Sequence, residues 1–325
     1  MLTRRHVILG ASTALTATAR AQPAWPNRPI RLLVPYPAGG GQDITARLLA
    51  EPLRASLGQP VIVENRSGAS GMIAAEALAR AAPDGYTLML GGAGETAANG
   101  ALFRGRIAYD PVADLRAIHI AASVPIVVLG NSDMPFQDIA GLIAHAKANP
   151  GKLSYSSSGV GNPQHLAGEL FNVMAGIDTQ HVPYRGSAPA VTDLAAGTVQ
   201  FGYNSLASAL PLIQANRIRP LGVTSRERMP QLPDAPAVAE YPPMAAYELV
   251  NWFGVFGPAG LPEPIVARIN AIVEAAIKEP SVRSRMEVQG LLPQSQTPAQ
   301  AHAFVAAEAE KLARIIADAR ITVER

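Results

Sequence analysis

The sequence predicts an α/β protein with two lobes, each a mostly parallel sheet flanked by helices. Three observations carry this prediction. Short apolar strands alternate with amphipathic helices, as is typical of parallel sheets covered on both faces. The alternation begins again after a long apolar segment at 118–128, and a dense apolar run at 250–256 is placed to return the chain to the first lobe. Two such crossings suit the closure of two lobes around a small ligand.

The first lobe is expected to begin with five alternating elements. Strands are predicted where apolar runs lie between turn residues, and helices where apolar residues recur at helical spacing. In chain order these are strand 30–35, helix 44–57, strand 61–64, helix 73–82 and strand 86–90. The Gly- and Pro-containing turns at 58–60 and 83–85 end the two helices.

The same alternation follows in the second lobe, and three helices complete the first. Between the crossings we expect helix 136–148, strand 153–156, helix 163–175, strand 180–182 and helix 188–196. After the second crossing, helices are expected at 265–278, 281–289 and 298–318. These elements place 22–124 and 249–325 in a discontinuous domain 1, and 125–248 in domain 2.

Residues 1–21 have the features of a secretory signal. The pair Arg4-Arg5 precedes a weakly apolar run at 7–19, and an A-x-A cleavage sequence ends at Ala21. The run is shorter than the roughly 20 apolar residues that span a bilayer. We therefore expect a periplasmic protein that begins at Gln22, exported by the Sec or the twin-arginine route.

Composition excludes several classes of function. The net charge of +2 becomes −1 when the three arginines of the leader are removed, so the pI of 9.0 does not indicate nucleic-acid binding. The chain has no cysteine, which excludes disulfides and a thiol nucleophile. The six histidines show no ligand spacing, so neither a metal site nor a cofactor is expected.

Gly- and Ser-rich turns lead from strands into helices at three places, 36–41, 156–163 and 183–187. Asn162 is expected to cap its helix with Pro163 in the first helical position, and Ser187 to cap the third. The N-terminus of a helix favours an anion, and ligands of α/β proteins bind at the carboxyl ends of the strands. These three turns are therefore the candidate site.

Six ordered segments carry a resemblance to a known family. They are WPNRPIRLLVPYPAGGGQDITARLLA, GQPVIVENRSGASG, APDGYTLML, SSSGVGNPQHLAGELF, HVPYRGSAPAVTDLAAG and NWFGVFGPAGLP. Together they resemble the Bug family of periplasmic receptors, the solute-binding proteins associated with tripartite tricarboxylate transporters. The resemblance implies a type II periplasmic-binding-protein fold that closes on small carboxylates. Receptors for di- and tricarboxylates, amino acids and aromatic acids all belong to this family.

The resemblance also implies ligand-binding residues in both lobes. In the first lobe these are Tyr36, Pro37, Ala38, Gly39, Gly40 and Asp43, and in the second Ser157, Gly159, Gly161, His165, Tyr184 and Gly186. Asp43 is also expected to cap its helix, and His165 to be a helix-surface or capping residue. Tyr36 and Tyr184 either contact the ligand or pack at the domain edge.

Two departures from the family pattern concern the solute. Glu95 occurs among the small residues of 92–96, and Asn204 stands where relatives commonly have an acid. Both argue against a simple di- or tricarboxylate. Glu95 either pairs with an ammonium or hydroxyl group of an amino-acid-like solute or is a solvated loop residue, and the second interpretation is favoured.

The expected function is a periplasmic receptor that captures a small carboxylate for a tripartite tricarboxylate permease. An alternative is a sensor subunit that presents the solute to a histidine-kinase ectodomain. A hydrolase built from Ser157 or Ser158, His165 or His181, and Asp178 lacks the G-x-S-x-G elbow, so the protein is not expected to be an enzyme. The run GGGQDI does not fit a dinucleotide-binding turn.

Overall fold

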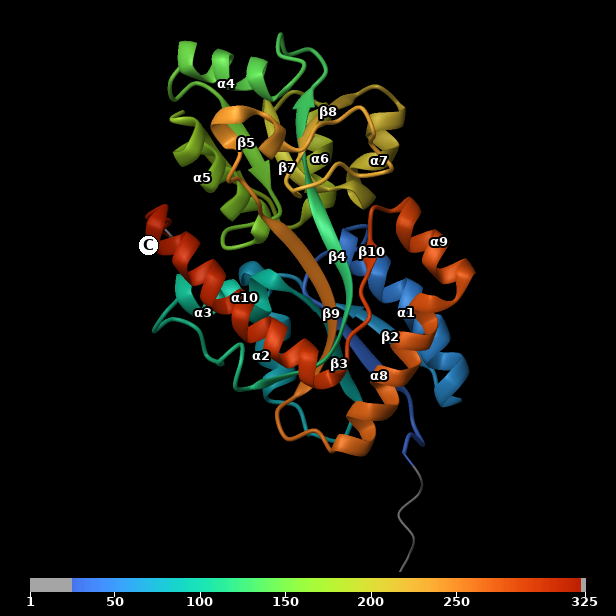
Figure 1. The fold of residues 1–325 in the computed structure, drawn as a ribbon. Coiled ribbons are helices and arrows are strands. Elements are labelled where there is room, and N and C mark those ends of the chain that lie inside the picture. Colours follow the sequence, from blue (N-terminus) through green and yellow to red (C-terminus); the bar gives the residue numbers. More distant parts are fainter. Residues whose placement is uncertain (1–24, 323–325) are drawn as a thin grey trace, which may run out of the picture.

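The two lobes share one continuous sheet. The computed structural model describes residues 25–322, so the predicted leader at 1–21 lies outside the described residues. The strand order is β2-β1-β3-β9-β4-β7-β5-β6, and β8 and β10 also pair with β4. Figure 1 shows β4 and β9 running side by side from one lobe into the other.

The first lobe contains both ends of the described chain. Its N-terminal part consists of β1 (Ile30–Val34), α1 (Gly41–Leu57), β2 (Val61–Asn65), α2 (Met72–Ala79), β3 (Thr87–Gly92), the π-helical turn η2 (Gly94–Ala98) and α3 (Asn99–Leu102). Its C-terminal part consists of α8 (Glu263–Lys278), α9 (Pro280–Val288), β10 (Leu292–Pro293) and α10 (Pro298–Asp318).

The second lobe lies between the two crossing strands β4 (Leu115–Asn131) and β9 (Val250–Pro258). It consists of α4 (Ile139–Ala148), β5 (Ser154–Ser157), α5 (Pro163–Ala175), β6 (Gln180–Pro183), α6 (Ser187–Ala195), β7 (Phe201–Ser205), α7 (Leu206–Gln214) and β8 (Ile218–Val223). No helix within 25–322 combines the length and apolarity needed to cross a membrane.

Parallel and antiparallel pairs divide the sheet by position. In the first lobe β1 pairs in parallel with β2 and β3, and in the second β5 pairs in parallel with β6 and β7. The crossing strands are antiparallel to their neighbours. Along β4 the partner changes from β9 to β7 between Pro125 and Ile126. Each lobe therefore keeps its own parallel strands, and β4 joins them.

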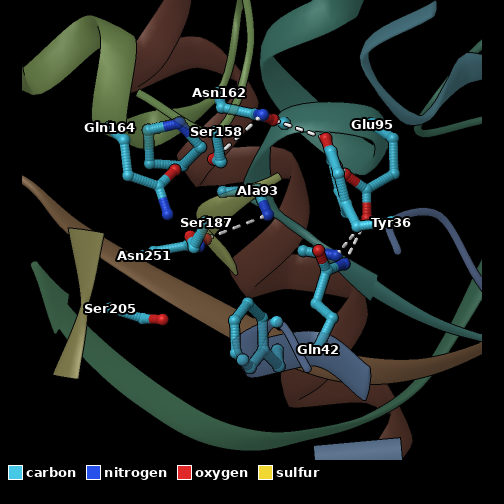
Figure 2. Close-up of a pocket in the computed structure, with 16 residues that line it drawn as sticks. Tyr36, Gln42, Ala93, Glu95, Ser158, Asn162, Gln164, Ser187, Ser205 and Asn251 are labelled. Carbon is cyan, nitrogen blue, oxygen red and sulfur yellow. Dashed lines mark hydrogen bonds between the residues drawn. The ribbon is translucent and has the colours of Figure 1, made fainter. Parts of the chain in front are cut away.

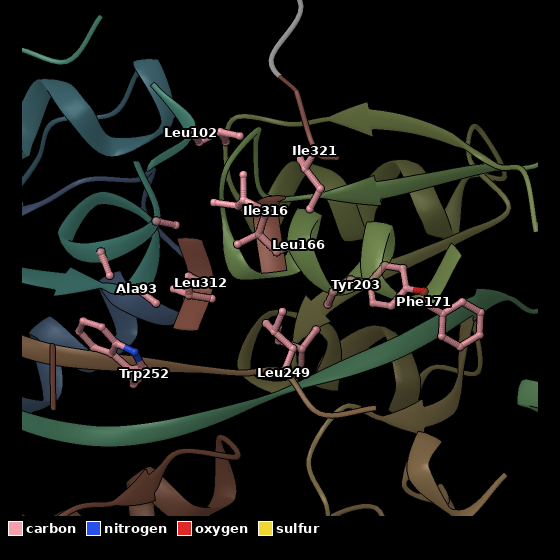
Figure 3. Packing of buried hydrophobic residues seen from close by; sticks show 14 of the residues in the cluster. Ala93, Leu102, Leu166, Phe171, Tyr203, Leu249, Trp252, Leu312, Ile316 and Ile321 are labelled. Carbon is pink, nitrogen blue, oxygen red and sulfur yellow. The ribbon is translucent and has the colours of Figure 1, made fainter. Parts of the chain in front are cut away.

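A hydrophobic cluster extends through both lobes. Figure 3 shows Leu312 of α10 and Leu166 of α5 in this cluster, together with Leu249 and Trp252 at the second crossing. All four side chains are buried. Burial of a large apolar side chain contributes roughly 1.5–3 kcal/mol, so contacts of this kind tie α10 to the other lobe.

Several element bounds differ from the sequence prediction for identifiable reasons. Helix α1 begins at Gly41 rather than residue 44, because its first turn has no apolar residue from which the helical pattern could be recognised. Helix α4 begins at Ile139 rather than 136, because the Asp138 side chain accepts the N–H of Gly141 as an N-cap. The strand predicted at 118–128 extends over Leu115–Asn131. Helices α5 and α10 have the predicted bounds.

Four segments differ from the sequence prediction or were absent from it. The loop predicted at 92–96 is the end of β3 followed by the helical turn η2. The helix predicted at 73–82 ends at Ala79. Helix α7 and strand β8 were not predicted, although their segment is as apolar as those that were.

A candidate ligand site between the two lobes

Four helices begin at one cavity between the lobes. They are α1 from the first lobe and α5, α6 and α7 from the second, with N-cap residues Gly40, Asn162, Gly186 and Ser205. None of these four residues caps its helix through a side-chain hydrogen bond. The first-turn N–H groups of a helix have no partner within the helix, so these ends offer backbone donors to the cavity.

The cavity is polar and has no cationic side chain in its wall. The residues from 25–322 that line it include no Lys, Arg or His. Figure 2 shows its lining, in which Tyr36, Glu95 and Gln42 lie on one side and Gln164, Asn251 and Ser205 on the other. Its attraction for an anion would come from helix termini and hydrogen-bond donors.

Glu95 is a buried residue of the cavity wall, with 1% of its surface exposed. Its Oε1 atom accepts hydrogen bonds from Gln42 Nε2 at 2.7 Å and from the backbone N–H of Gly92 at 2.6 Å. Burial raises the pKa of Glu95 to about 7, although these hydrogen bonds oppose the shift. The favoured interpretation of Glu95 as a solvated loop residue is therefore wrong.

A buried hydrogen bond joins the two lobes beside Glu95. Tyr36 Oη donates to Asn162 Oδ1 at 2.6 Å, and Asn162 Nδ2 donates to Ser158 Oγ at 3.2 Å. Burial raises the pKa of Tyr36 well above its usual value, so the phenol stays neutral and remains a donor. Asn162 occupies the predicted N-cap position, but its side chain is engaged by the other lobe instead of by its own helix.

Asp43 holds the first Gly-rich turn against α1. Its Oδ2 accepts the N–H of Gly39 at 3.0 Å, and its Oδ1 pairs with Arg47 at 2.9 Å and with Asn65 at 3.0 Å. Gly39 has φ +82, which an L-residue adopts only with strain. Asp43 thus lies in the first turn and fixes the preceding turn, while the N-cap itself is Gly40.

Residues 45–321 match the family described as tripartite tricarboxylate transporter family receptor. The chain belongs to this family. The UPF0065 protein in the tcbD-tcbE intergenic region of a Pseudomonas species is 38% identical over 325 residues, 99% of this chain and 96% of that protein. Protein BugT of Bordetella pertussis is 34% identical, covering 97% of each chain.

Solved structures share the fold of this receptor. An R. palustris protein with adipate has a TM-score of 0.89 and 36% identity, covering 92% of this chain and 99% of that chain. MatC from Rhodopseudomonas palustris with bound malate has a TM-score of 0.85 and 30% identity, covering 90% and 100%. The two-lobed type II periplasmic-binding-protein fold is therefore confirmed, and the chain is a solute-binding receptor of the Bug type.

The predicted site residues occupy different places in the receptor. Three of them line the cavity: Tyr36, Gly40 and Glu95. Gly186 lies in the contact between lobes, since a Cβ there would stand 3.1 Å from Pro37 Cδ. Gly186 and the other ten predicted residues do not line this cavity, and these ten are Pro37, Ala38, Gly39, Asp43, Ser157, Gly159, Gly161, His165, Tyr184 and Asn204. Asn204 is fully buried within β7, where it pairs with Val127 of β4.

Ser157 and two histidines form a separate buried group. Ser157 Oγ lies 2.6 Å from His181 Nε2, and the His181 ring stacks on His165 with centroids 4.0 Å apart. His165 is buried, so it is not a helix-surface residue, and its Nδ1 accepts the N–H of Gly161, which precedes the N-cap of α5. Burial lowers the pKa of His165 to about 4 and of His181 to about 3. Within the described chain Asp178 forms no hydrogen bond with His165 or His181, although Glu169 Oε1 lies 3.9 Å from His165 Nε2.

Sequence reasoning missed several cavity residues. Ser158 and Ser187 adjoin predicted residues in the same turns, so a wider window around each turn would have included them. Ser187 is also not the N-cap of α6 but its first residue, after Gly186 at φ +120. Gln42 and Asn251 carried no local signal, because an amide in a first helical turn or on a strand is common.

Proposed function

We propose that this receptor captures a small carboxylate-containing solute between its lobes and delivers it to a membrane permease of the tripartite tricarboxylate type. The observation that carries the proposal is the convergence of four helix N-termini on one cavity without a lining Lys, Arg or His among residues 25–322. Backbone donors from both lobes would bind the carboxylate only when the lobes are closed.

The energetics suit a solute that must later be released. A hydrogen bond to a charged group contributes about 1.5–3 kcal/mol, and a helix N-terminus adds roughly 0.3–1 kcal/mol. A few such contacts hold a carboxylate firmly, and they are lost together when the lobes separate. A buried Lys or Arg would bind anions of many kinds through its net charge. Neutral donors instead select an anion by the geometry of its hydrogen bonds.

Relatives support the carboxylate and the transport role. Two R. palustris neighbours were solved with adipate and with malate, and the family is named for its transporters. The sensor-subunit alternative has no observation in its favour within the described part of the chain. A sensor subunit would need a surface that docks on a histidine-kinase ectodomain, and neither the cavity nor the related proteins support such a surface.

Calorimetry tests the carboxylate directly. The mature chain is titrated with mono- and dicarboxylates of three to six carbons and with the corresponding carboxamides. At least one carboxylate should bind, and its carboxamide should bind at least about tenfold more weakly, because it cannot accept charge-assisted hydrogen bonds. Equal affinity for acid and amide, or no binding by any member, would contradict the proposal.

Export and lobe division complete the proposal. We expect the periplasmic protein to begin at Gln22, as N-terminal sequencing would show, and retention of Met1 would contradict it.

The domain boundaries at 124/125 and 248/249 gain support from the change of β4 partner between Pro125 and Ile126. These positions are the proposed hinge.

A further inference from the structure

We infer that the solute carries a hydrogen-bond donor, an ammonium or hydroxyl group, at a distance from its carboxylate, and that Gln42 recognises this donor. The inference rests on the proposed function and specifies the solute class of the same cavity. It is carried by two buried amide side chains, Gln42 and Asn251, whose orientations are fixed in opposite senses.

The amide of Gln42 is oriented by Glu95. Gln42 Nε2 donates to Glu95 Oε1 at 2.7 Å, and the backbone N–H of Gly92 donates to the same oxygen at 2.6 Å. Two donors occupy the lone pairs of that oxygen, so any proton on the carboxyl group resides on Oε2. The nitrogen of Gln42 therefore faces Glu95 in either protonation state. Its Oε1 atom, to which no group within 25–322 donates, is left as an acceptor at the cavity.

Asn251 presents the opposite group. Its Oδ1 atom accepts the N–H of Trp252 at 2.8 Å and that of Ala93 at 3.4 Å. This leaves the Nδ2 atom of Asn251 as a donor at the cavity. Figure 2 shows Asn251 and Gln42 on different sides of the pocket. A solute that satisfies both amides must accept hydrogen bonds at one end and donate at the other.

The charge around Gln42 disfavours a second carboxylate there. Glu95 lies directly behind Gln42 and forms no ion pair with any residue in 25–322. The other titratable groups against it are Tyr36 and Tyr109, whose pKa values are raised by burial so that both remain neutral. A carboxylate at this place would lose hydration and face an acceptor, whereas an ammonium or hydroxyl group would gain a partner.

Matched ligands separate this inference from the proposed function. The mature chain is titrated with straight-chain carboxylates of three to six carbons that end in an amino group, a hydroxyl group, a carboxylate or a methyl group. For at least one length, the amino or hydroxy acid should bind about tenfold more tightly than both the dicarboxylate and the methyl-terminated acid. If the dicarboxylate binds best at every length, the inference is overturned and the proposed function stands. If no carboxylate binds, both are overturned.

Two variants test the role of Gln42. Gln42→Met removes the acceptor at similar volume and should lower the affinity for the donor-bearing ligand at least about tenfold more than the affinity for the methyl-terminated acid, so that the preference is abolished. Glu95→Gln keeps an oxygen that accepts from Gly92 and Gln42, so the preference for a hydroxy acid should remain. Each variant is checked for an unchanged unfolding transition. A Gln42→Met protein that keeps its preference would overturn the inference.

Proton release distinguishes the ammonium from the hydroxyl group. An ammonium near Glu95 favours the ionised carboxyl group, and burial raises the pKa of this group to about 7. Titrations at pH 7 in buffers of different ionisation enthalpy should then show release of a fraction of a proton, absent in Glu95→Gln. A hydroxy acid should release none in either protein. Proton uptake by the wild type with the best ligand would contradict a donor at this position.

Discussion

Glu95 is a carboxyl group whose environment stabilises its neutral form. It is 1% exposed, and within the described chain it has hydrogen-bond donors but no ion pair. Burial raises its pKa to about 7, whereas the unfolded chain ionises near 4.5. Between these two pH values the folded receptor binds more protons at this residue than the unfolded chain does. Ionisation of Glu95 therefore destabilises the fold.

The first prediction concerns stability against pH in the absence of solute. The pKa of Glu95 is raised on folding, so the contribution of Glu95 to the unfolding free energy is greatest below about pH 4.5. This contribution falls by up to ~3 kcal/mol as the pH rises to about 7. Urea unfolding gives the unfolding free energies of wild type and Glu95→Gln at each pH. The difference between the two proteins should change by up to ~3 kcal/mol between about pH 4.5 and pH 7. A difference that is constant from pH 4 to 8 would refute the prediction.

The second prediction concerns Asp43 and the turn before α1. Asp43→Asn weakens the bonds to Gly39, Arg47 and Asn65, so we expect a loss of about 1–3 kcal/mol in unfolding free energy and weaker solute binding. The matched control is Glu51→Gln on the same helix, whose exposed pair with Arg54 contributes little. Equal effects of the two substitutions in chemical unfolding would contradict this role of Asp43.

At the scale of elements, helix N-termini and the turn η2 form the site together. Helix α5 brings Asn162 against the start of η2, where a Cβ on Gly94 would overlap Asn162 Oδ1. A side chain at position 94 would displace this oxygen, which accepts the hydrogen bond from Tyr36. The close contact of α5 with η2 is thus a condition for the Tyr36 to Asn162 hydrogen bond.

The third prediction is that Gly94→Ala prevents full closure. The added methyl group keeps Asn162 from its position, so solute affinity should fall by at least about tenfold. The free, open receptor should be as stable as wild type, because Gly94 begins a helical turn that alanine favours. Calorimetric affinity and thermal unfolding measure the two effects. Unchanged affinity would show that the lobes bind solute without this contact.

At the scale of the molecule, the chain described at 25–322 passes between the lobes at two crossings, which are strand β4 and the segment that leads into β9. Strand β4 pairs with β9 up to Pro125 and with β7 from Ile126 onward, while α10 packs mainly on β4, η2 and α3 and also contacts α5 of the second lobe. We expect bending at this exchange of partners to let each lobe move with its own parallel strands intact.

The fourth prediction is a change of shape on binding. A solute that contacts both lobes selects the closed form, so small-angle scattering should give a smaller radius of gyration at saturation. Gly94→Ala, saturated with the same solute, should remain closer to the free value. An identical radius for free and saturated wild type would indicate a preformed site.

The sequence by itself determined the alternation of strands and helices, the bounds of α5 and α10, and the Gly-rich turns that begin α1, α5 and α6. These features depend on apolar periodicity, helix caps and helix-ending residues, all of which act over a few neighbouring residues. The roles of Gln42, Glu95 and Asn251 depend on neighbours far along the chain. Glu95 is buried because η2 packs beside Tyr36 and Gln42, and Gln42 is oriented because Glu95 is there. Only the tertiary structure decides burial and orientation of this kind, since both arise from contacts between distant segments.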